Sequence, residues 1–499
     1  MKFASKKASP PYLLALDIGS SSARALIFNA QGEPLSGAKA QRGLRMRTSP
    51  DGAAEFDADA LLAQVVAVID DLLTQAEDRA QDIVGVAVDT FVSSLVGVDG
   101  EGRALTPLLT YADTRAAGEV AGLRAEFDEA SVHNRTGCRF HPSYWPAQLR
   151  WAYRAWPERC ARVTRWMTLG EYLELTLFGE AAISVSAASW TGLLDRRRLV
   201  WDEALLAGLP IKRAQLSPLV DASQPRRGLK PAFARRWPAL ARVPWLPAIG
   251  DGAAANIGSG CATPDRVALT MGTSSAMRAV TTEDIDALPS GLWCYRVDAQ
   301  RSLPGGALTE GGMVYRWMTE TLRLPDLSDL DALLAAMPPD AHGLTVLPFL
   351  AGERSPGWQG HARAAIHGLT LATTPLDILR AGMEAVAYRI ALVYRQLRTL
   401  LPDDPIIIAS GGALIHSPAW VQILADVLGR PITLARVPEA TARGAALLAA
   451  ETLGLIPDVA AAPDLLGEPF SSNPDHHAIY QAAIQRQMAL YDKLIINDA

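Results

Sequence analysis

A hydroxyl-rich turn occurs twice in the chain, about half a chain length apart, and this repeat narrows the folds that the chain can adopt. The two copies span residues 13–28 and 267–280. Each has an apolar run, a glycine, three hydroxyl residues, a short spacer, an arginine and a second apolar run, which predicts two strands joined by a tight turn. Asp17 of the first copy aligns with Thr270 of the second. The repeat therefore predicts two related domains that differ in chemistry.

The length supports this division, because a single core stops growing at about 250–300 residues and the chain has 499. Hydrophobic residues make up 49% and charged residues 20%, the balance of an ordinary folded protein. The net charge is −6, and no block of like charges stands out. We therefore expect neither nucleic acid nor a membrane surface as a partner.

The four cysteines are far apart and form no CxxC pair, which predicts neither a disulfide framework nor a zinc site and fits the reducing cytosol. The N-terminus lacks the apolar run of a secretory signal, and no run of about 18 apolar residues predicts a membrane span. We expect a cytoplasmic protein. The sequence does not fix its oligomeric state and leaves a homodimer open.

The pattern of apolar runs predicts an α/β protein. We place one domain at 12–260 and a second at 261–455, because the second hairpin starts just after a stretch of small residues that ends near position 260. Residues 456–499 are expected to form a helical extension. Short β-branched runs between longer helical patterns predict sheets with helices on their faces.

Individual elements are predicted from apolar periodicity and from capping residues. A helix is expected over 56–76 with Asp57 as its N-cap, followed by a buried strand over 83–88. In the second half, a long amphipathic helix is expected over 375–400 and a buried strand over 406–410. That strand runs directly into a glycine pair.

The repeated turn is suited to phosphate. Glycine lets the backbone approach a ligand, successive amides form an anion-binding nest, and hydroxyls donate further hydrogen bonds. One such turn would read as an ordinary hairpin, but two copies can grip a polyphosphate from both sides of an interdomain cleft. A carboxylate beside bound phosphates needs a cation between them, so Asp17 is predicted to lie at a Mg²⁺ site. The alternative is a turn-capping aspartate.

Asp251 lies between two glycines at a predicted helix N-terminus, where a carboxylate can act as general base for a hydroxyl group. The alternative role is plain N-capping. Residues 250–255 also match the dinucleotide fingerprint, although no βαβ unit surrounds them, so a nicotinamide enzyme stays a weak alternative. The pair Gly411 and Gly412 fits either close approach to adenine or a tight turn.

Further polar residues allow two interpretations. Asp113 and Arg115 could bind sugar hydroxyls or could form a surface salt bridge at a helix start. The histidines, including His141, His367 and His416, lack metal-ligand spacing and would by default be structural.

Several motifs occur in an informative order along the chain. They are Asp17–Arg24, Leu105–Pro107, Tyr111–Ala116, Gly250–Gly252, Met271–Ser274, Leu347–Pro356, Ser410–Ala413 and Ala440–Ala446. In these motifs, over roughly residues 12–450, the chain resembles the FGGY carbohydrate kinases of the actin/hexokinase/Hsp70-like ATPase superfamily.

The resemblance implies two ribonuclease-H-like domains and transfer of the ATP γ-phosphate to a sugar hydroxyl, with ATP and Mg²⁺ as cofactors and a small sugar or polyol as substrate. It implies Asp251 as the catalytic base and Asp17 as the carboxylate near Mg²⁺. The nucleotide residues that it implies are Gly19, Ser20, Ser21, Ser22, Arg24, Gly272, Thr273, Gly312, Gly411, Gly412 and His416. The substrate residues that it implies are Val92, Ser93, Asp113, His141, Tyr144, Asp251 and Gly252.

Within the family the chain looks most like gluconate kinases, in the segments 137–151, 166–179 and 187–195. Two positions depart from that pattern. Ser93 stands where gluconate and xylulose kinases usually have a substrate-contacting histidine, and Gln148 stands where they usually have lysine. Both departures remove a potential positive charge, which adds weight to a neutral ketose such as xylulose or ribulose, or to a polyol, over a sugar acid. A non-catalytic sugar-binding regulatory protein on the same fold is a further alternative, against which the retained aspartates and turns argue.

Overall fold

Two large sheets organise the structure, a computed structural model that describes residues 8–326 and 328–497. The first sheet has five strands in the order β14-β6-β1-β2-β3, and the second has seven in the order β17-β18-β16-β15-β21-β22-β23. The first sheet comprises β1 (Tyr12–Ile18), β2 (Ser22–Asn29), β3 (Pro34–Gly43), β6 (Ile83–Thr90) and β14 (Ile249–Gly250). The second comprises β15 (Arg266–Met271), β16 (Ser275–Ala279), β17 (Trp293–Arg296), β18 (Ser302–Leu308), β21 (Ile406–Ser410), β22 (Ile432–Ala435) and β23 (Leu466–Phe470).

Both predicted hairpins form, and in each sheet the hairpin supplies the first two strands along the chain. Strands β1 and β2 pair antiparallel, as do β15 and β16. The first strand of each hairpin also pairs with a parallel strand on its other side: β1 pairs with β6, and β15 pairs with β21. Parallel strands bring their carboxyl ends to one edge of a sheet. The first sheet therefore gathers the residues after β1, β6 and β14 at a single edge.

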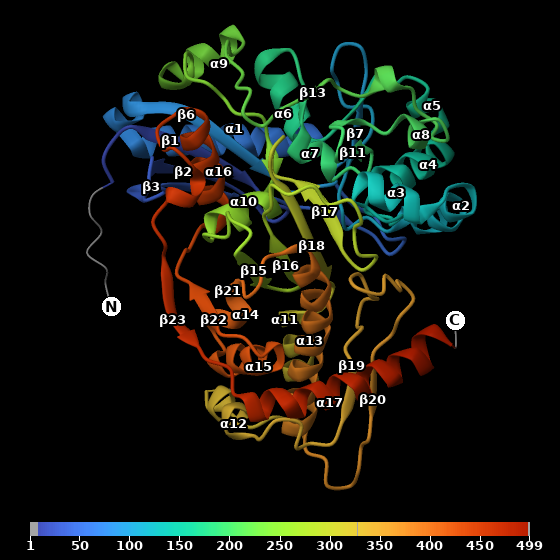
Figure 1. Cartoon of the computed structure of the whole chain (residues 1–499). Coiled ribbons are helices and arrows are strands. Elements are labelled where there is room, and N and C mark those ends of the chain that lie inside the picture. Colours follow the sequence, from blue (N-terminus) through green and yellow to red (C-terminus); the bar gives the residue numbers. More distant parts are fainter. Residues whose placement is uncertain (1–7, 327, 498–499) are drawn as a thin grey trace.

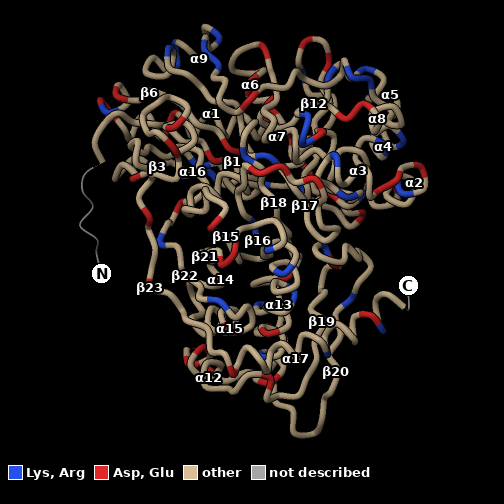
Figure 2. The backbone as a smooth tube through the Cα atoms, viewed as in Figure 1, with Lys and Arg blue, Asp and Glu red and all other residues tan. Residues whose placement is uncertain are grey.

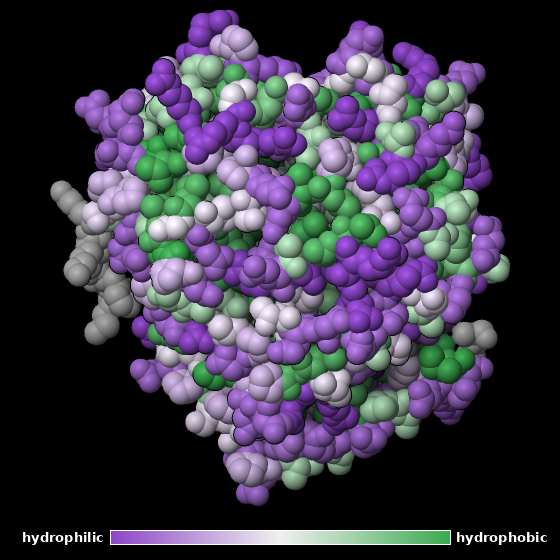
Figure 3. Space-filling view, turned by 45° about the horizontal axis from the view of Figure 1, so that its top comes forward, coloured by the Kyte–Doolittle hydropathy of each residue, from purple (hydrophilic) through white to green (hydrophobic). Residues whose placement is uncertain are grey.

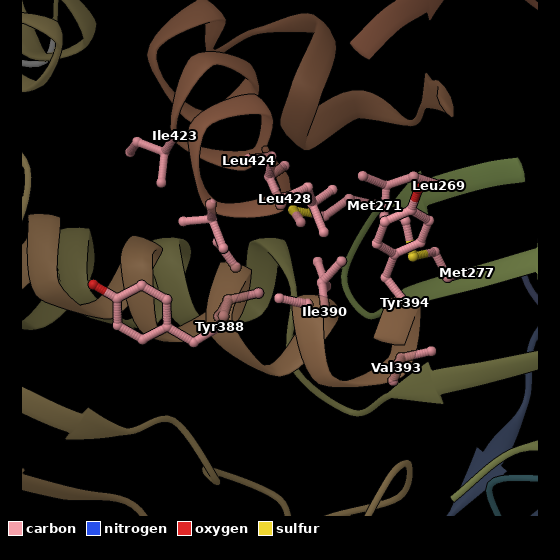
Figure 4. Packing of buried hydrophobic residues seen from close by; sticks show 14 of the residues in the cluster. Leu269, Met271, Met277, Tyr388, Ile390, Val393, Tyr394, Ile423, Leu424 and Leu428 are labelled. Carbon is pink, nitrogen blue, oxygen red and sulfur yellow. The ribbon is translucent and has the colours of Figure 1, made fainter. Parts of the chain in front are cut away.

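Helices cover the sheets as the apolar patterns predicted. Helix α1 (Ala58–Ala76) packs on the first sheet, and the Asp57 side chain accepts from the Ala60 N–H as its N-cap. In the second domain α13 (Pro375–Leu397) packs against both the second sheet and α15 (Pro418–Leu428). Figure 4 shows side chains of α13 and α15 packed with β15 and β16 residues in this core.

The remaining elements fill out both domains. The helices are α2 (Glu119–Glu126), α3 (Glu129–Thr136), α4 (Trp145–Ala155), α5 (Pro157–Cys160), α6 (Leu169–Phe178), α7 (Val185–Ser189), α8 (Glu203–Leu206), α9 (Pro231–Arg236), α10 (Asp251–Gly258), α11 (Gly312–Thr321), α12 (Leu330–Ala336), α14 (Gly412–Ile415), α16 (Ala440–Thr452) and α17 (Pro474–Tyr491). The short strands are β4 (Arg47–Thr48), β5 (Ala54–Phe56), β7 (Val96–Val98), β8 (Leu108–Leu109), β9 (Arg165–Met167), β10 (Ile183–Ser184), β11 (Leu194–Asp195), β12 (Val200–Trp201), β13 (Leu219–Val220), β19 (Thr345–Leu347) and β20 (Ala365–His367). Most helices between α2 and α9 cap the upper lobe in Figure 1.

Helices α10 and α16 cross at the junction of the two sheets, in front of β1 and β6 (Figure 1). Glycines make this crossing possible. A Cβ on Gly258 would lie 1.7 Å from the Ala440 carbonyl oxygen, and one on Gly444 would lie 1.8 Å from the Ala254 carbonyl oxygen. The backbones therefore touch at two reciprocal points, and any larger residue would force the helices apart.

The C-terminal segment contains a helix, as predicted, and also a strand that was not predicted. Residues 456–499 were expected as a helical extension, but β23 pairs antiparallel with β22 and completes the second sheet. Helix α17 then packs beneath that domain, where the Tyr480 hydroxyl donates to Glu384 of α13 at 3.0 Å. The strand is half-exposed and has only short apolar runs, so its pattern was too weak to identify it.

Surface charge and hydropathy are mixed. Acidic and basic residues are interspersed along both domains in Figure 2. Hydrophilic residues predominate on the face drawn in Figure 3, and hydrophobic residues form separate patches there. Among the helices of residues 8–326 and 328–497, none has both the length and the apolar character of a membrane span.

Candidate active site

Three aspartates meet at the carboxyl edge of the first sheet. Asp17 near the end of β1 is in parallel register with Asp89 near the end of β6. Asp89 is in turn in register with Ile249, two residues before Asp251. The charges of Asp17 and Asp251 both act on Asp89. The edge thus concentrates carboxylates that lie far apart in the sequence.

Asp17 and Asp89 form a buried pair that is short of positive charge. The guanidinium of Arg24 lies 2.8 Å from Asp17, but neither Asp89 oxygen has a hydrogen-bond partner among the described residues. Burial raises the pKa of Asp17. Burial and then the neighbouring Asp17 charge raise the pKa of Asp89 well above its usual range. Such a pair with free oxygens fits a divalent cation, which would keep both groups ionised.

Asp251 is the first residue of α10, and Gly250 precedes the helix as its N-cap. The Gly252 N–H donates to Asp251 Oδ1 at 2.7 Å. Burial raises the pKa of Asp251 to about 6, although the charge of Arg278 partly offsets this. A carboxylate with such a pKa can both accept a proton near neutral pH and release it afterwards, as a general base must. The sequence predicted that Asp251 lies at a helix start, and the structure identifies Gly252 and Arg278 as the groups that act on its carboxylate.

Of the predicted nucleotide residues, those of the second domain lie together at the corresponding edge of the second sheet. The Gly312 N–H at the start of α11 donates to the Gly272 carbonyl at 2.8 Å, and the Met313 N–H donates to the Thr273 carbonyl at 3.0 Å. Gly411 has φ +103°, and a Cβ there would lie 2.2 Å from the Met271 carbonyl oxygen. Only glycine permits this close packing of three segments.

A cavity of about 380 Å³ opens beside this junction. The lower wall includes Tyr315 and Trp420, whose rings lie 6.0 Å apart. The size and the aromatic and glycine walls suit a flat heterocycle. The lining residues are Gly272, Thr273, Gly312, Met313, Tyr315, Arg316, Gly412, Ala413, His416, Ser417 and Trp420. His416, which would by default be structural, lines this cavity together with Gly272, Gly312 and Gly412.

The first hydroxyl turn is tight and partly exposed. The Gly19 N–H donates to the Ser22 carbonyl at 3.0 Å, and the Ser21 carbonyl accepts from the Leu44 N–H at 2.9 Å. The hydroxyls of Ser20 and Tyr111 lie 3.3 Å apart. The Ser20 and Ser21 side chains thus remain accessible in front of the aspartates, as a phosphate-binding turn requires.

The predicted sugar-side residues line an aromatic surface. The ring of Trp190 stacks on Tyr295, with ring centroids 3.5 Å apart, and a Cβ on Gly250 would lie 2.5 Å from Trp190 Nε1. The hydroxyls of Tyr144 and Tyr295 lie 2.5 Å apart. Trp190 thus lies directly against the start of α10, so this surface flanks Asp251.

His141 belongs to the same surface. Its ring lies edge-on to Tyr144, with centroids 6.2 Å apart. Burial, and then the charge of Arg354, lower the pKa of His141 to about 3, so the ring is neutral near pH 7. The Ser143 N–H donates to His141 Nδ1 at 3.2 Å, and the Ser143 hydroxyl lies 2.9 Å from the same nitrogen.

The loop before Ser94 carries two further predicted residues. Ser93 has φ +57°, a left-handed conformation that costs a non-glycine residue free energy. Its hydroxyl donates to the Trp190 carbonyl at 2.8 Å. Val92 packs against Gly250, because a Cβ there would lie 2.8 Å from Val92 Cγ1. The Ser93 hydroxyl thus links the loop after β6 to Trp190 of the aromatic surface.

The side chains of Asp113 and Gln148 both bond to other groups of the protein. Asp113 accepts from the Ala54 N–H at 3.1 Å and pairs with Arg115 at 2.6 Å, so the salt bridge that the sequence allowed is present, and it is buried. Gln148 Nε2 donates to the Thr110 carbonyl at 3.1 Å. Both side chains hold the wall of the site in place. Gln148 consequently supplies no charge towards a substrate.

Sequence reasoning missed four charged groups, namely Asp89, Arg278, Glu310 and Arg354. Asp89 could have been found, because it lies at the end of the buried strand 83–90, next to the strand of Asp17. Arg278 was noted only as part of the repeat. Glu310 is fully buried, and neither of its carboxylate oxygens has a partner among the described residues. Arg354 belongs to a loop whose position only the tertiary structure fixes.

Comparisons with known proteins agree with this arrangement. Residues 12–258 match the model of the N-terminal domain of the FGGY family of carbohydrate kinases, and residues 267–453 match the C-terminal domain model. The chain is 25% identical to the gluconokinase of Bacillus subtilis (strain 168) over 93% of this chain and 92% of the relative. It is 30% identical to glycerol kinase 1 of Pseudomonas aeruginosa over 90% of this chain and 91% of the relative.

Solved structures give the same result. A gluconate kinase from Lactobacillus acidophilus superposes with a TM-score of 0.90 at 25% identity, and a xylulose kinase from the same organism with 0.91 at 25% identity. Each alignment covers 97% of this chain and 98% of the other. The predicted fold of two ribonuclease-H-like domains is thereby confirmed.

Proposed function

This chain belongs to the FGGY family of carbohydrate kinases, and we propose that it phosphorylates gluconate or a similar sugar acid with Mg²⁺-ATP. Phosphoryl transfer from ATP to a sugar or polyol is the activity of the family, and the finer assignment of the substrate rests on two observations. The chain aligns with a gluconokinase over almost its full length. The guanidinium of Arg278 also acts on Asp251, and its buried Nε and Nη1 have no hydrogen-bond partner among the described residues.

Asp251 carries the proposed chemistry. Its carboxylate would accept the proton of the attacking hydroxyl, and burial at the start of α10 gives it the pKa of about 6 that this step needs. The Gly252 N–H at 2.7 Å fixes the orientation of the carboxylate. Arg278, from the second domain, opposes the negative charge of Asp251. Its guanidinium is therefore well placed to offset charge that develops during transfer.

The two hydroxyl turns would bind the phosphates from opposite sides. Asp17 and Asp89 would hold Mg²⁺, whose charge neutralises phosphate oxygens during transfer. The fit rests on the unpartnered Asp89 oxygens and on the raised pKa values of both carboxyls. Gly272, Gly312 and Gly411 would position the nucleotide, since their close packing shapes the cavity beside them.

A neutral ketose is the second candidate substrate. The superposition with a xylulose kinase is as good as that with a gluconate kinase, and Ser93 lacks the charge of the histidine found at that position in relatives. ADP release measured with gluconate, xylulose, ribulose, xylitol and glycerol tests both candidates. We expect the highest kcat/KM with gluconate. Higher activity on any neutral compound would contradict the sugar-acid assignment, and no sugar-stimulated ADP release would contradict the kinase itself.

A further inference from the structure

The C-terminal helix α17 contacts a buried ion pair of the second domain. The helix runs beneath that domain and passes β19 (Figure 1). At its end the Tyr491 hydroxyl donates to Glu353 Oε2 at 2.6 Å. Glu353 is buried and also pairs with Arg389 of α13, whose guanidinium lies 4.8 Å from the centroid of the Tyr491 ring. Tyr491 thus completes a buried triad of a phenol, a carboxylate and a guanidinium.

The turn 353–359 is folded around the Glu353 carboxylate. The Gly357 N–H donates to Glu353 Oε1 at 3.2 Å, and the Gln359 N–H donates to Oε2 at 3.3 Å. The Glu353 N–H donates in turn to the Gln359 carbonyl at 3.0 Å. Gly357 leaves no room for a side chain, because a Cβ there would lie 2.1 Å from the Tyr491 hydroxyl oxygen. The Tyr491 hydroxyl is therefore packed directly against the turn that its hydrogen bond supports.

The turn presents Trp358 to the first domain. The Trp358 ring lies edge-on to His141, with ring centroids 6.1 Å apart, and it packs in the buried cluster that contains Tyr144 and Trp190. The Trp358 indole N–H donates to the Gly291 carbonyl at 3.3 Å. His141 and Tyr144 are predicted substrate residues. A ring from the second domain therefore joins the aromatic surface that the first domain supplies.

Tyr491 lies outside the part of the chain that the family models match, which ends at residue 453. The turn and α13 lie inside that part. The pair of Glu353 and Arg389 therefore belongs to the matched domain, whereas its third member comes from the C-terminal extension. A buried carboxylate is costly when one of its hydrogen-bond donors is lost, because the freed oxygen cannot reach water. The extension thus contributes to the order of a turn that reaches the candidate site.

We propose that Tyr491 is a positioning residue of the candidate active site, which acts through the turn 353–359 to hold Trp358 against His141. The effect on the sugar rests on the proposed kinase function, whereas the effect on the turn rests on the contacts alone. A wall that is ordered before the sugar arrives lowers the entropy cost of binding. Loss of the hydroxyl should therefore weaken sugar binding. It should leave nucleotide binding unchanged, because the cavity beside Gly312 is lined by no residue of the turn.

The test uses Tyr491→Phe, which removes one oxygen atom and keeps the ring beside Arg389. Steady-state ADP release is measured with gluconate, or with whichever sugar of the panel the wild-type enzyme prefers. We expect the KM for the sugar to rise about fivefold, and kcat and the KM for ATP to change less than about twofold. Hydrogen exchange of the segment 353–359 follows the turn without any substrate. Its amides should exchange about tenfold faster in the variant.

Tyr480→Phe is the matched control. The Tyr480 hydroxyl belongs to the same helix and bonds at 3.0 Å to Glu384, which pairs with Arg380, so this variant loses the same kind of hydrogen bond. Among the described residues, none of the hydrogen-bond partners of Glu384 belongs to the turn. Both variants should lower the melting temperature. Only Tyr491→Phe should raise the KM for the sugar and the exchange rate of the turn.

Equal increases of the sugar KM in the two variants would reflect a general loss of stability and would overturn the proposal. Wild-type exchange of the turn in Tyr491→Phe would overturn it as well. Trp358→Leu removes the ring and leaves α17 intact, so it should raise the same KM, and adding Tyr491→Phe to it should raise that KM no further. A further increase would contradict the route through Trp358. Absence of turnover with every sugar would refute the proposed kinase function, and hydrogen exchange would still decide whether Tyr491 holds the turn.

Discussion

The two sheets carry the same hairpin but different chemistry at equivalent positions. In the first sheet Asp17 is in register with Asp89, and in the second Thr270 is in register with Ser410. The acidic pair is buried and has Arg24 as its only close cation among the described residues, whereas the hydroxyls of Thr270 and Ser410 lie 3.3 Å apart, within hydrogen-bonding distance. The duplicated framework thus has an acidic edge in the first domain and a neutral, hydroxyl-bearing edge in the second, which fits the proposed division between cation and nucleotide.

The arginines of the two hairpins diverge in the same way. Arg24 lies opposite Asp17 in the β1–β2 register and pairs with it at 2.8 Å. Arg278 lies opposite Ala268, two positions further along its strand than the residue opposite Thr270. Its guanidinium is consequently free to act on Asp251 of the first domain. A shift of two residues thus replaces an ion pair within one sheet by an electrostatic interaction between the two domains.

The largest effect is expected at Asp251, the first-domain residue on which the charge of Arg278 from the second domain acts. Asp251→Asn removes the general base and keeps the side-chain volume, so kcat should fall about 10³-fold. ATP binding, followed by calorimetry, should stay within about threefold of wild type, because the candidate adenine cavity is lined by residues of the second domain and does not include Asp251. Near-normal turnover of this variant would reject the role of Asp251.

The comparison of the two edges is tested by matched substitutions at equivalent positions. Asp17→Asn should lower kcat/KM about 10- to 100-fold and raise the Mg²⁺ concentration needed for half-maximal rate, as losses around metal sites do. Thr270→Ala at the corresponding position should change neither quantity more than about threefold. If both variants showed the same Mg²⁺ dependence as wild type, the cation would not belong to the first edge.

At the crossing of α10 and α16, a side chain at Gly258 or Gly444 is expected to lower the stability of the fold. Gly444→Ala places a methyl group against the Ala254 carbonyl, and overpacking of this kind costs about 1–3 kcal/mol of unfolding free energy. Thermal and urea denaturation would measure the loss. Gly43→Ala, at a glycine with open space around it, is the control and should leave the midpoint almost unchanged. An unchanged midpoint in Gly444→Ala would mean that the helices separate without cost.

The smallest effect concerns pH. Because Asp251 must be ionised to act as a base and burial raises its pKa to about 6, activity should fall about tenfold for each pH unit below 6. The charge of Arg278 lowers that pKa, so Arg278→Gln should move the acid limb to higher pH. Profiles of kcat/KM against pH for both proteins check the direction. If the acid limb of the profile stayed at the same pH in Arg278→Gln, the charge of Arg278 would not control the pKa of Asp251.

The repeat explains why much of the fold could be predicted. Strand periodicity and a glycine before three hydroxyls identify both hairpins locally, and Asp57 marks the start of α1 by capping it. Strand β23 could not be predicted, because a half-exposed edge strand has little apolar periodicity and depends on β22 for its pairing.

The sequence by itself determined the two domains, the two hydroxyl turns and the candidate base, because spacing and residue type encode these features locally. Only the tertiary structure decided which charges meet. The parallel register of β1 and β6 places Asp89 beside Asp17, and the loop of the second domain that holds Trp358 brings its ring against His141 of the first domain. Such meetings depend on long-range packing, and desolvation then sets the pKa of each group. The substrate therefore depends on contacts that no single segment of the chain contains.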